Sequence, residues 1–409
     1  MILLSVRITL PDGDETAVGE LACGDPDAAG AFTAEFEYAA AWLRHPQRFP
    51  LDPLSLPLGR GRFAARNLEP PLAVFDDALP DDWGRALIVR QRRLPRGQQG
   101  APYVLRELAA HHGPNVGALR FVLGNDPPVG RQPAGVVDLA ALAAAAEAFE
   151  AGLADDSAGL RLLFAAGSSL GGARPKALVT DGSCDWIAKF PSTKRDGRFD
   201  VVGLEAVGLD LASRAGLVVP AHDLRTLGDT RQRALLVERF DLTGSAGRRH
   251  MISLRTLCKE RPGAYAQTYT ELAEVVRQVS AQPQTDVDCL FRQMTFNAVF
   301  GNTDDHLKNF WMVHDHAGYR LSPAFDLVPD VGGRREHTLA FEYERNPPTR
   351  SELLALAKRW NVIAAGNLID AVAASMAQFT AVAEARGVPS ANIAEIGADV
   401  ARRANPLAS

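Results

Sequence analysis

The side chains best suited to chemistry gather between residues 301 and 309, in the segment Gly-Asn-Thr-Asp-Asp-His-Leu-Lys-Asn. Asp304 supplies a carboxylate that can receive or orient a hydroxyl proton. Asn309 supplies an amide oxygen, and oxygen atoms are the ligands that Mg²⁺ prefers. A base beside a metal ligand is what the transfer of a phosphoryl group requires.

The chain after this segment is predicted to bring a second carboxylate to it. Residues 310–313 and 319–321 are predicted as the two strands of a hairpin, and Asp326 follows the second strand. Facing residues at the open end of a hairpin lie ~5 Å apart. We therefore expect Asn309 and Asp326 to lie close together, where they could share a metal ion.

The same residues allow a simpler interpretation. The Asp-x4-Asn spacing matches the catalytic loop of eukaryotic protein kinases, but it also arises often by chance. Asp304, Asp305 and Asn309 could instead shape a turn, as Asp and Asn frequently do. His306 is not expected to bind a metal, because no second His or Cys stands at ligand spacing. Lys308 could steady a phosphate or face solvent. The predicted hairpin favours a site over a turn.

A loop of small residues upstream could bind an anion. It covers residues 167–176 and precedes a predicted strand, so its backbone N–H groups could surround a phosphate, with Arg174 or Lys176 at the edge. The loop lacks the Gly-x4-Gly-Lys-Ser/Thr pattern of a P-loop. A flexible linker is the alternative.

Two further features are expected to serve a nucleotide. Lys189 lies in an apolar strand, and an inward-facing lysine needs a charged partner. Glu205, on the next predicted helix, is a candidate for the Lys–Glu ion pair of protein kinases. The alternative is a solvated lysine at the strand end. The backbone of residues 238–240 would offer hydrogen-bond donors and acceptors to an adenine ring.

Composition excludes several classes of protein. The 409 residues are 46% hydrophobic and 23% charged, which favours a folded chain with two or three packed units over a disordered one. A net charge of −5 argues against a broad cationic surface for nucleic acid. The four cysteines are scattered, and no apolar run approaches the length of a membrane span. We expect a cytoplasmic protein without a membrane anchor.

Local patterns place a sheet-rich part before a helix-rich part. Residues 1–10 are predicted as a strand, and a helix begins at Asp81 or Asp82. Asp138 can cap another helix, and Phe36, Trp42 and Leu43 are spaced as on a helix. After residue 250 the predicted helices cover residues 271–279, 287–300, 351–359 and 366–383. We expect three domains, at residues 1–130, 131–249 and 250–409.

In sequence order, the motifs of this chain resemble the HipA family of bacterial toxin kinases. The shared segments are Ser-Ser-Leu-Gly-Gly-Ala-Arg-Pro-Lys, Ile-Ala-Lys-Phe-Pro, Val-Glu-Arg-Phe-Asp, Gly-Asn-Thr-Asp-Asp-His-Leu-Lys-Asn and Ser-Pro-Ala-Phe-Asp-Leu. Residues 54–58, 74–83 and 116–121 look like the N-terminal subdomain of that family. The resemblance implies an α+β, two-lobed protein-kinase-like fold. A sheet-rich nucleotide lobe and a helical C-terminal lobe would follow a small N-terminal α/β subdomain.

The resemblance also implies roles for individual residues. Asp304 would be the catalytic base, Lys189 would contact phosphate, and Asn309 and Asp326 would hold Mg²⁺. Ser169 falls where the family phosphorylates itself, and the adjacent Ser168 remains an alternative. The implied ATP contacts are Gly171, Gly172, Ala173, Arg174, Pro175, Lys176, Lys189, Glu238, Arg239, Phe240, His306, Lys308 and Asn309.

The family resemblance implies ATP and Mg²⁺ as cofactors and a small helix-turn-helix antitoxin as partner, with DNA reached only through that antitoxin. A protein substrate is implied as well, in known family members an aminoacyl-tRNA synthetase whose phosphorylation stalls translation and inhibits growth. Two other functions stay open. One is a small-molecule or lipid kinase with the same nucleotide site, and the other is a corepressor bound to the antitoxin.

Overall fold

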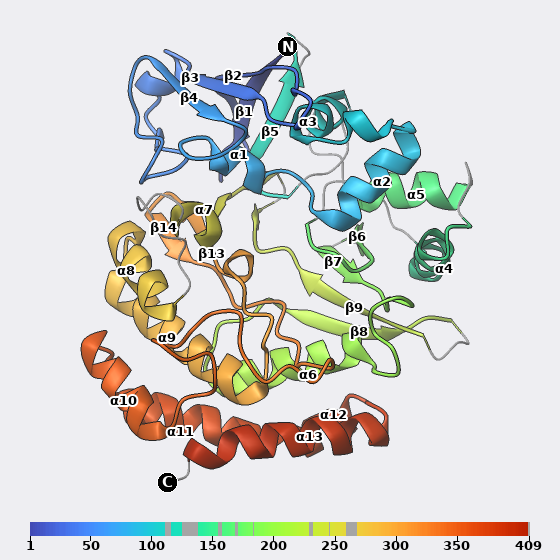
Figure 1. Ribbon diagram of the computed structural model, residues 1–409, viewed down its shortest axis with the longest axis vertical. Helices are drawn as coiled ribbons and strands as arrows, with labels where there is room; N and C mark the ends of the chain where they lie inside the picture. Colours follow the sequence, from blue (N-terminus) through green and yellow to red (C-terminus); the bar gives the residue numbers. More distant parts are fainter. Residues whose placement is uncertain are drawn as a thin grey trace. The chain divides into compact units, whose positions relative to one another are not determined.

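A computed structural model describes residues 1–110, 116–124, 138–153, 158–167, 171–182, 184–228, 232–244, 246–258 and 268–407 (Figure 1). The chain divides into two compact units. The first comprises Met1–Ala188, Arg239–Glu260 and Val313–Gly318, and the second comprises Lys189–Glu238, Arg261–Met312 and Tyr319–Ser409. Each unit is formed by segments that are distant in sequence.

An antiparallel five-stranded sheet begins the first unit, in the order β4-β3-β2-β1-β5. Its strands are β1 (Ile2–Thr9), β2 (Glu15–Cys23), β3 (Thr33–Tyr38), β4 (Arg62–Arg66) and β5 (Leu119–Leu123). Leu4, Val6 and Ile8 of β1 alternate with more exposed residues and are buried, as a sheet with one covered face requires. The ring of Phe36 packs against that of Phe75, with centroids 4.8 Å apart.

The remainder of the first unit is mostly helical. Its helices are α1 (Ala73–Asp77), α2 (Asp82–Arg92), α3 (Ala101–Ala110), α4 (Leu139–Glu150), α5 (Ala158–Gly167) and α7 (Leu254–Cys258). Helix α5 packs against both α2 and α4. The strands that follow are β6 (Lys176–Thr180), β7 (Asp185–Lys189), β10 (Leu242–Thr243), β11 (Gly247–Arg248) and β12 (His250–Ser253). Asp138 caps α4 as predicted, since its side chain accepts hydrogen bonds from the N–H groups of Ala140 and Ala141.

Helices dominate the second unit. They are α6 (Val201–Arg214), α8 (Tyr269–Val279), α9 (Pro283–Phe300), α10 (Arg350–Arg359), α11 (Ala365–Met376), α12 (Phe379–Ala385) and α13 (Ser390–Ala404). The antiparallel pair β8 (His222–Thr226) and β9 (Arg233–Glu238) packs on α6. Helices α11 and α13, in the red part of Figure 1, pack on α9, and α12 packs on α6. The core of the second unit therefore lies around α6 and α9, which are buried along much of their length.

Two helix predictions were wrong. Phe36 lies in β3, where Ala34, Phe36 and Tyr38 alternate with exposed residues, so the spacing of Phe36 from Trp42 reflected a strand followed by a short 3-10 turn. The helix predicted over residues 366–383 is two helices, α11 and α12, with a bend of 49° between them. Ser375, near the bend, is buried and donates a hydrogen bond to the carbonyl of Leu211.

Across the described ranges, no single helix has both the length and the apolar character to cross a membrane. Taken together, the bent pair of α11 and α12 is long and apolar enough, by length and composition only.

Candidate active site

The candidate catalytic loop begins where α9 ends. Gly301 has φ +76°, a left-handed conformation that glycine adopts without steric cost, and its N–H closes the helix on the carbonyl of Asn297. The predicted end of this helix at residue 300 is confirmed. The chain then turns through Asn302 and Thr303, both buried, and presents Asp304 to solvent.

Asp305 anchors this loop in the core of the second unit. It is fully buried and accepts hydrogen bonds from the hydroxyl of Tyr269 at 2.6 Å and from Nδ1 of His337 at 3.1 Å. The N–H groups of Thr338 and Leu339 donate to its other oxygen at 2.8 and 3.2 Å. A buried carboxylate is tolerated only when its oxygens are satisfied in this way. Asp305 therefore fixes the backbone from which Asp304 projects.

Two asparagines connect the loop to its neighbours. The side chain of Asn309, at the end of the 3-10 turn Leu307–Asn309, donates a hydrogen bond to the carbonyl of Asp304 at 2.8 Å. Nδ2 of Asn302 lies 3.2 Å from Oδ1 of Asn297 and 3.5 Å from the carbonyl oxygen of Asp326. The second unit thus brings Asp304, Asn309 and Asp326 to one region.

The predicted hairpin is confirmed as β13 (Trp311–Asp315) and β14 (Gly318–Leu321). At its open end the N–H of Ser322 donates to the carbonyl of Trp311 at 2.9 Å, so the segments leading to Asn309 and Asp326 leave the hairpin side by side. Asp326 has φ +57°, which costs a residue with a side chain of order 1 kcal/mol, although Asp tolerates it better than most. This conformation sets the direction of its carboxylate.

Lys189 lies between two carboxylates. Its Nζ is 2.5 Å from Oε1 of Glu205 and 2.7 Å from Oδ1 of Asp326. The side chain of Glu205 is 5% exposed and that of Asp326 is 41% exposed, so one partner is buried and the other remains within reach of solvent. Burial acts to lower the pKa of Lys189, but the charges of Asp326 and Glu205 outweigh it and raise that pKa above its ordinary value. Lys189 is therefore a fixed cation.

The donor set suits Mg²⁺ better than a transition metal. Among the residues that the structure describes, no three His, Cys, Asp or Glu side chains are grouped so that they could hold a metal. Mg²⁺ does not need such a group, because it commonly takes one or two protein oxygen ligands together with phosphates and water. Asn309 and the half-exposed carboxylate of Asp326 offer that number of oxygen atoms.

The candidate phosphate loop belongs to the first unit and is held by α2. Oδ2 of Asp81 accepts a hydrogen bond from the N–H of Gly172 at 2.9 Å, and Gly172 has φ +82°. The N–H of Trp83 donates to the carbonyl of Gly172, and its Nε1 donates to the carbonyl of Lys176 at 2.9 Å. Asp81 stands at the N-cap of α2, but its side chain makes no capping hydrogen bond. The predicted helix start at Asp81 or Asp82 is confirmed at Asp82, and the carboxylate of Asp81 is used by the loop.

Other predicted ATP contacts are placed as follows. Ala173, Arg174 and Pro175 lie in the same described loop as Gly171, whereas Ser168 and Ser169 lie outside the described residues. The backbone N–H of Glu238 donates to the carbonyl of Ala221 and that of Arg239 to the carbonyl of Asp185. Phe240 accepts a hydrogen bond from Arg249 at its carbonyl. An adenine ring would therefore have to use other backbone groups of this segment.

His306 precedes the turn that carries Asn309, Lys308 lies within it, and both are half-buried. Their carbonyl oxygens accept hydrogen bonds, from the N–H of Asn309 at 2.8 Å and from Nε1 of Trp311 at 2.6 Å. Both residues thus support the loop through their backbone.

Four residues of this region had no assigned role in the sequence analysis. Asn302 and Asp305 stand near Asp304 in the polar segment, and shaping a turn was the alternative given for Asp305. Tyr269 and His337 are distant in sequence and become partners of Asp305 only through the fold. A buried tyrosine, histidine and carboxylate that satisfy one another leave no local pattern that could have revealed them.

The sequence matches the models of two protein-domain families. Residues 168–405 match the HipA-like C-terminal domain, and residues 13–122 match the HipA N-terminal domain. The chain is 29% identical over 345 residues to the candidate kinase Y4mE of Sinorhizobium fredii, covering 75% of this chain and 76% of that one. It is 25% identical over 207 residues to the toxin YjjJ of Escherichia coli, covering 46% of each.

The fold has a solved counterpart. HipA of Shewanella oneidensis, determined as a toxin–antitoxin system in complex with HipB and its operator DNA, superposes with a TM-score of 0.66 at 18% identity. The match covers 99% of this chain and 97% of that one. The predicted α+β, two-lobed kinase-like fold is thereby confirmed. The match to the HipA-like C-terminal domain alone spans more than half of the residues of this chain. The chain therefore belongs to the HipA family.

Proposed function

We propose that this chain is an ATP-dependent serine/threonine protein kinase. The observation that carries the proposal is the position of Lys189 between Glu205 and Asp326, at 2.5 and 2.7 Å, in the same unit as Asp304 and Asn309. A lysine held by a helix glutamate, with a metal-binding aspartate nearby, is the arrangement that phosphoryl transfer in kinases requires. The relative described as a kinase supports the same activity.

The proposed roles divide the reaction among few groups. Asp304, exposed at the tip of its loop, receives the proton of the acceptor hydroxyl and orients that hydroxyl toward the phosphate. Asn309 and Asp326 hold Mg²⁺, which when bound offsets the negative charge of the nucleotide phosphates. Lys189 contributes a positive charge to the same phosphates. The loop at residues 171–176, the segment at residues 238–240, and His306 with Lys308 form the remaining ATP contacts.

We further propose that the kinase acts in the cytoplasm as the toxin of a toxin–antitoxin pair. Its partner is a small helix-turn-helix antitoxin, and the kinase contacts DNA only through that antitoxin. The descriptions of the relative YjjJ as a toxin and of the HipA complex with HipB and operator DNA support this role. The proposed target is a translation-related protein such as an aminoacyl-tRNA synthetase.

Ser169 is the proposed autophosphorylation site, with Ser168 as the alternative. Residues 1–130, 131–249 and 250–409 are the proposed domains.

The test is transfer of label from γ-labelled ATP in the presence of Mg²⁺ and a cell lysate. The expected result is a labelled protein band whose modified residue is serine or threonine, and a band ~10²–10⁴-fold weaker when Asp304→Ala replaces the wild type. Label that appears in lipid or in a small metabolite would identify a different acceptor class. Complete absence of transfer from ATP to any fraction would contradict the kinase proposal.

A further inference from the structure

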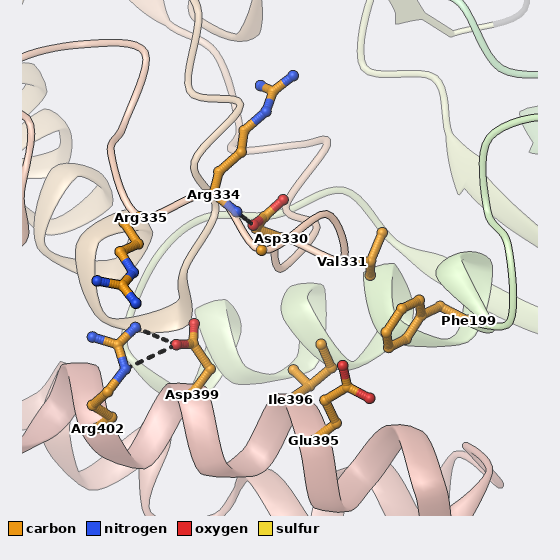
Figure 2. Close-up of a pocket in the computed structure, with 10 residues that line it drawn as sticks. Phe199, Asp330, Val331, Arg334, Arg335, Glu395, Ile396, Asp399 and Arg402 are labelled. Carbon is orange, nitrogen blue, oxygen red and sulfur yellow. Dashed lines mark hydrogen bonds and ion pairs between the residues drawn. The ribbon is translucent and has the colours of Figure 1, made fainter.

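A cavity of about 460 Å³ lies in the second unit, apart from the pair of Lys189 and Asp326 (Figure 2). It is open to solvent on one side and is lined by Phe199 before α6, by the segment at residues 330–335, and by α13. Its volume falls within the range of small-molecule sites, ~300–1,000 Å³. The cavity is large enough for an organic ligand rather than a single ion.

The acidic side chains that line the cavity are already engaged. Asp330 accepts hydrogen bonds from the backbone N–H groups of Gly332 and Arg334. Glu395 forms an ion pair with Arg198 at 2.5 Å. Asp399 is held by Arg402 and, at 2.6 Å, by Nε of Arg403. A cationic ligand would have to displace one of these partners.

One arginine, by contrast, is available there, and a second is paired only with Asp399. Arg335 is exposed and, within the described part of the chain, its side chain has no hydrogen bond and no ion pair. Figure 2 shows Arg335 and Arg402 pointing toward one another, whereas Arg334 points away from the cavity. The carboxylate of Asp399 offsets the charge of Arg402 but not that of Arg335, so an anion placed between the two guanidinium groups would be attracted by Arg335. Guanidinium groups also match carboxylate and phosphate oxygens in geometry.

The opposite end of the cavity is mostly apolar, with the carboxylate of Glu395 beside its apolar residues. Phe199 and Val331 are half-buried, Ile396 is buried, and all three line the cavity. Figure 2 shows them grouped away from Arg335 and Arg402. Burial of an apolar group at this end would add to binding in proportion to the area removed from water.

We infer that this cavity is a second ligand site, which binds a small organic anion with its phosphate or carboxylate between Arg335 and Arg402 and its apolar part against Phe199, Val331 and Ile396. The site goes beyond the proposed transfer of phosphate at Asp304, and its binding step does not depend on that activity.

The cavity is joined to the candidate catalytic loop by buried contacts. Asp399, which holds Arg402, also holds Arg403. Arg403 donates to the carbonyl of Arg334 at 3.1 Å and lies 3.4 Å from Nε2 of His337, whose other ring nitrogen contacts Asp305. In addition, the N–H of Asp330 donates to the carbonyl of Gly301. An anion that draws Arg402 from Asp399 therefore changes the support of the loop that carries Asp304.

The test measures binding of phenyl phosphate to the full chain by calorimetry, with the nucleotide site saturated by a non-hydrolysable ATP analogue. Inorganic phosphate and benzyl alcohol are run beside it to separate the anionic from the apolar contribution. The wild type should bind phenyl phosphate saturably and more tightly than either fragment. Arg335→Gln and Arg402→Gln should each weaken binding roughly tenfold to a hundredfold, because a charge-assisted hydrogen bond is lost.

Arg225→Gln is the matched control, since Arg225 pairs with Asp223 on β8 and does not line the cavity. It should bind phenyl phosphate as the wild type does. Arg335 has no partner to lose, so its variant should also keep the melting temperature of the wild type. No saturable binding by a folded wild type would overturn the inference, as would equal affinity in Arg335→Gln, Arg402→Gln and Arg225→Gln. Because the assay requires no phosphoryl transfer, its failure is distinct from failure of the kinase proposal.

Discussion

Nζ of Lys189 and Oδ1 of Asp326 are 2.7 Å apart, although 137 residues separate them in the sequence. Asp326 reaches this position from a left-handed backbone conformation, φ +57°. The carboxylate proposed to hold Mg²⁺ is thus oriented by a strained backbone and by a lysine that Glu205 fixes from the other side. The two carboxylates leave one negative charge in excess over Lys189, which a bound cation would offset, and each change in Asp326 alters both the metal site and the lysine.

Asp326→Asn should raise the Mg²⁺ concentration needed for activity and weaken ATP binding in Mg²⁺, because a charged ligand of a hard cation is lost. Asn tolerates the left-handed conformation about as well as Asp, so the backbone should be preserved. Titration of a fluorescent ATP analogue with and without Mg²⁺ measures the effect. Unchanged affinity in Mg²⁺ would show that Asp326 does not hold the metal.

Asp304→Ala should reduce phosphoryl transfer ~10²–10⁴-fold, the usual cost of removing a general base. Its side chain is 66% exposed, and its contact with Arg334 at 3.6 Å is a surface pair of little energetic weight. The melting temperature should therefore stay near that of the wild type. A purified variant with full activity would remove Asp304 from the mechanism.

Asp305→Asn should lower the turnover number while leaving ATP affinity nearly unchanged. An amide group cannot accept all the hydrogen bonds that reach Asp305 from Tyr269, His337 and the backbone of Thr338 and Leu339. One buried donor left without a partner costs about 1–3 kcal/mol. Denaturant unfolding checks the stability, and steady-state kinetics separates the turnover number from the Michaelis constant for ATP. Wild-type turnover in a destabilised variant would limit Asp305 to a structural role.

The chain should lose stability in mild acid through His250. Burial lowers the pKa of His250 to about 4, opposed by its hydrogen bond to the carbonyl of Leu51. The unfolded chain takes up a proton near pH 6.5, so the stability is complete above pH 6.5 and falls as the pH drops toward 4. The full loss is about 3 kcal/mol. Urea unfolding at pH 7 and pH 5 should show a smaller loss for His250→Gln, which keeps a donor but does not titrate. An equal loss in both proteins would assign the acid sensitivity to other groups.

Local patterns in the sequence predicted most of the elements near the site. Gly301 after an amphipathic helix, Asp138 before an alanine-rich one, and the turn between β13 and β14 each act within a few residues. The side-by-side exit of the segments that lead to Asn309 and Asp326 followed from the geometry of that hairpin. Such features depend on backbone rules that hold for any chain, so a single sequence is enough to recognise them.

Long-range contacts could not be predicted in the same way. The network around Asp305 joins residues 28 to 66 positions apart, and the cavity combines Phe199 with residues near 330 and 400. Nothing in the spacing of His337 or Arg403 distinguishes a buried partner from a solvated side chain. Their roles depend on how α9 and α13 pack, which local propensity does not determine.

The contact between Asp81 and Gly172 is a further case, and it bears on nucleotide binding. The carboxylate of Asp81 accepts the Gly172 N–H at 2.9 Å, in the manner of a phosphate oxygen. If the loop at residues 171–176 surrounds nucleotide phosphates, Asp81 competes with them for this donor and repels them by its charge. Asp82, the next residue, is exposed at the start of the same helix and carries the same charge.

Asp81→Ala should therefore bind ATP several-fold more tightly than the wild type, whereas Asp82→Ala should not. The same change removes a charge-assisted hydrogen bond that ties the loop to α2, so it should lower the stability of the chain by about 1–3 kcal/mol. Tighter nucleotide binding by a less stable protein is an unusual combination, which a general loss of structure would not produce. Calorimetric titration with ATP and Mg²⁺ gives the affinity, and thermal unfolding without nucleotide gives the stability. Equal ATP affinity in Asp81→Ala, Asp82→Ala and the wild type would mean that the N–H of Gly172 does not face the phosphates.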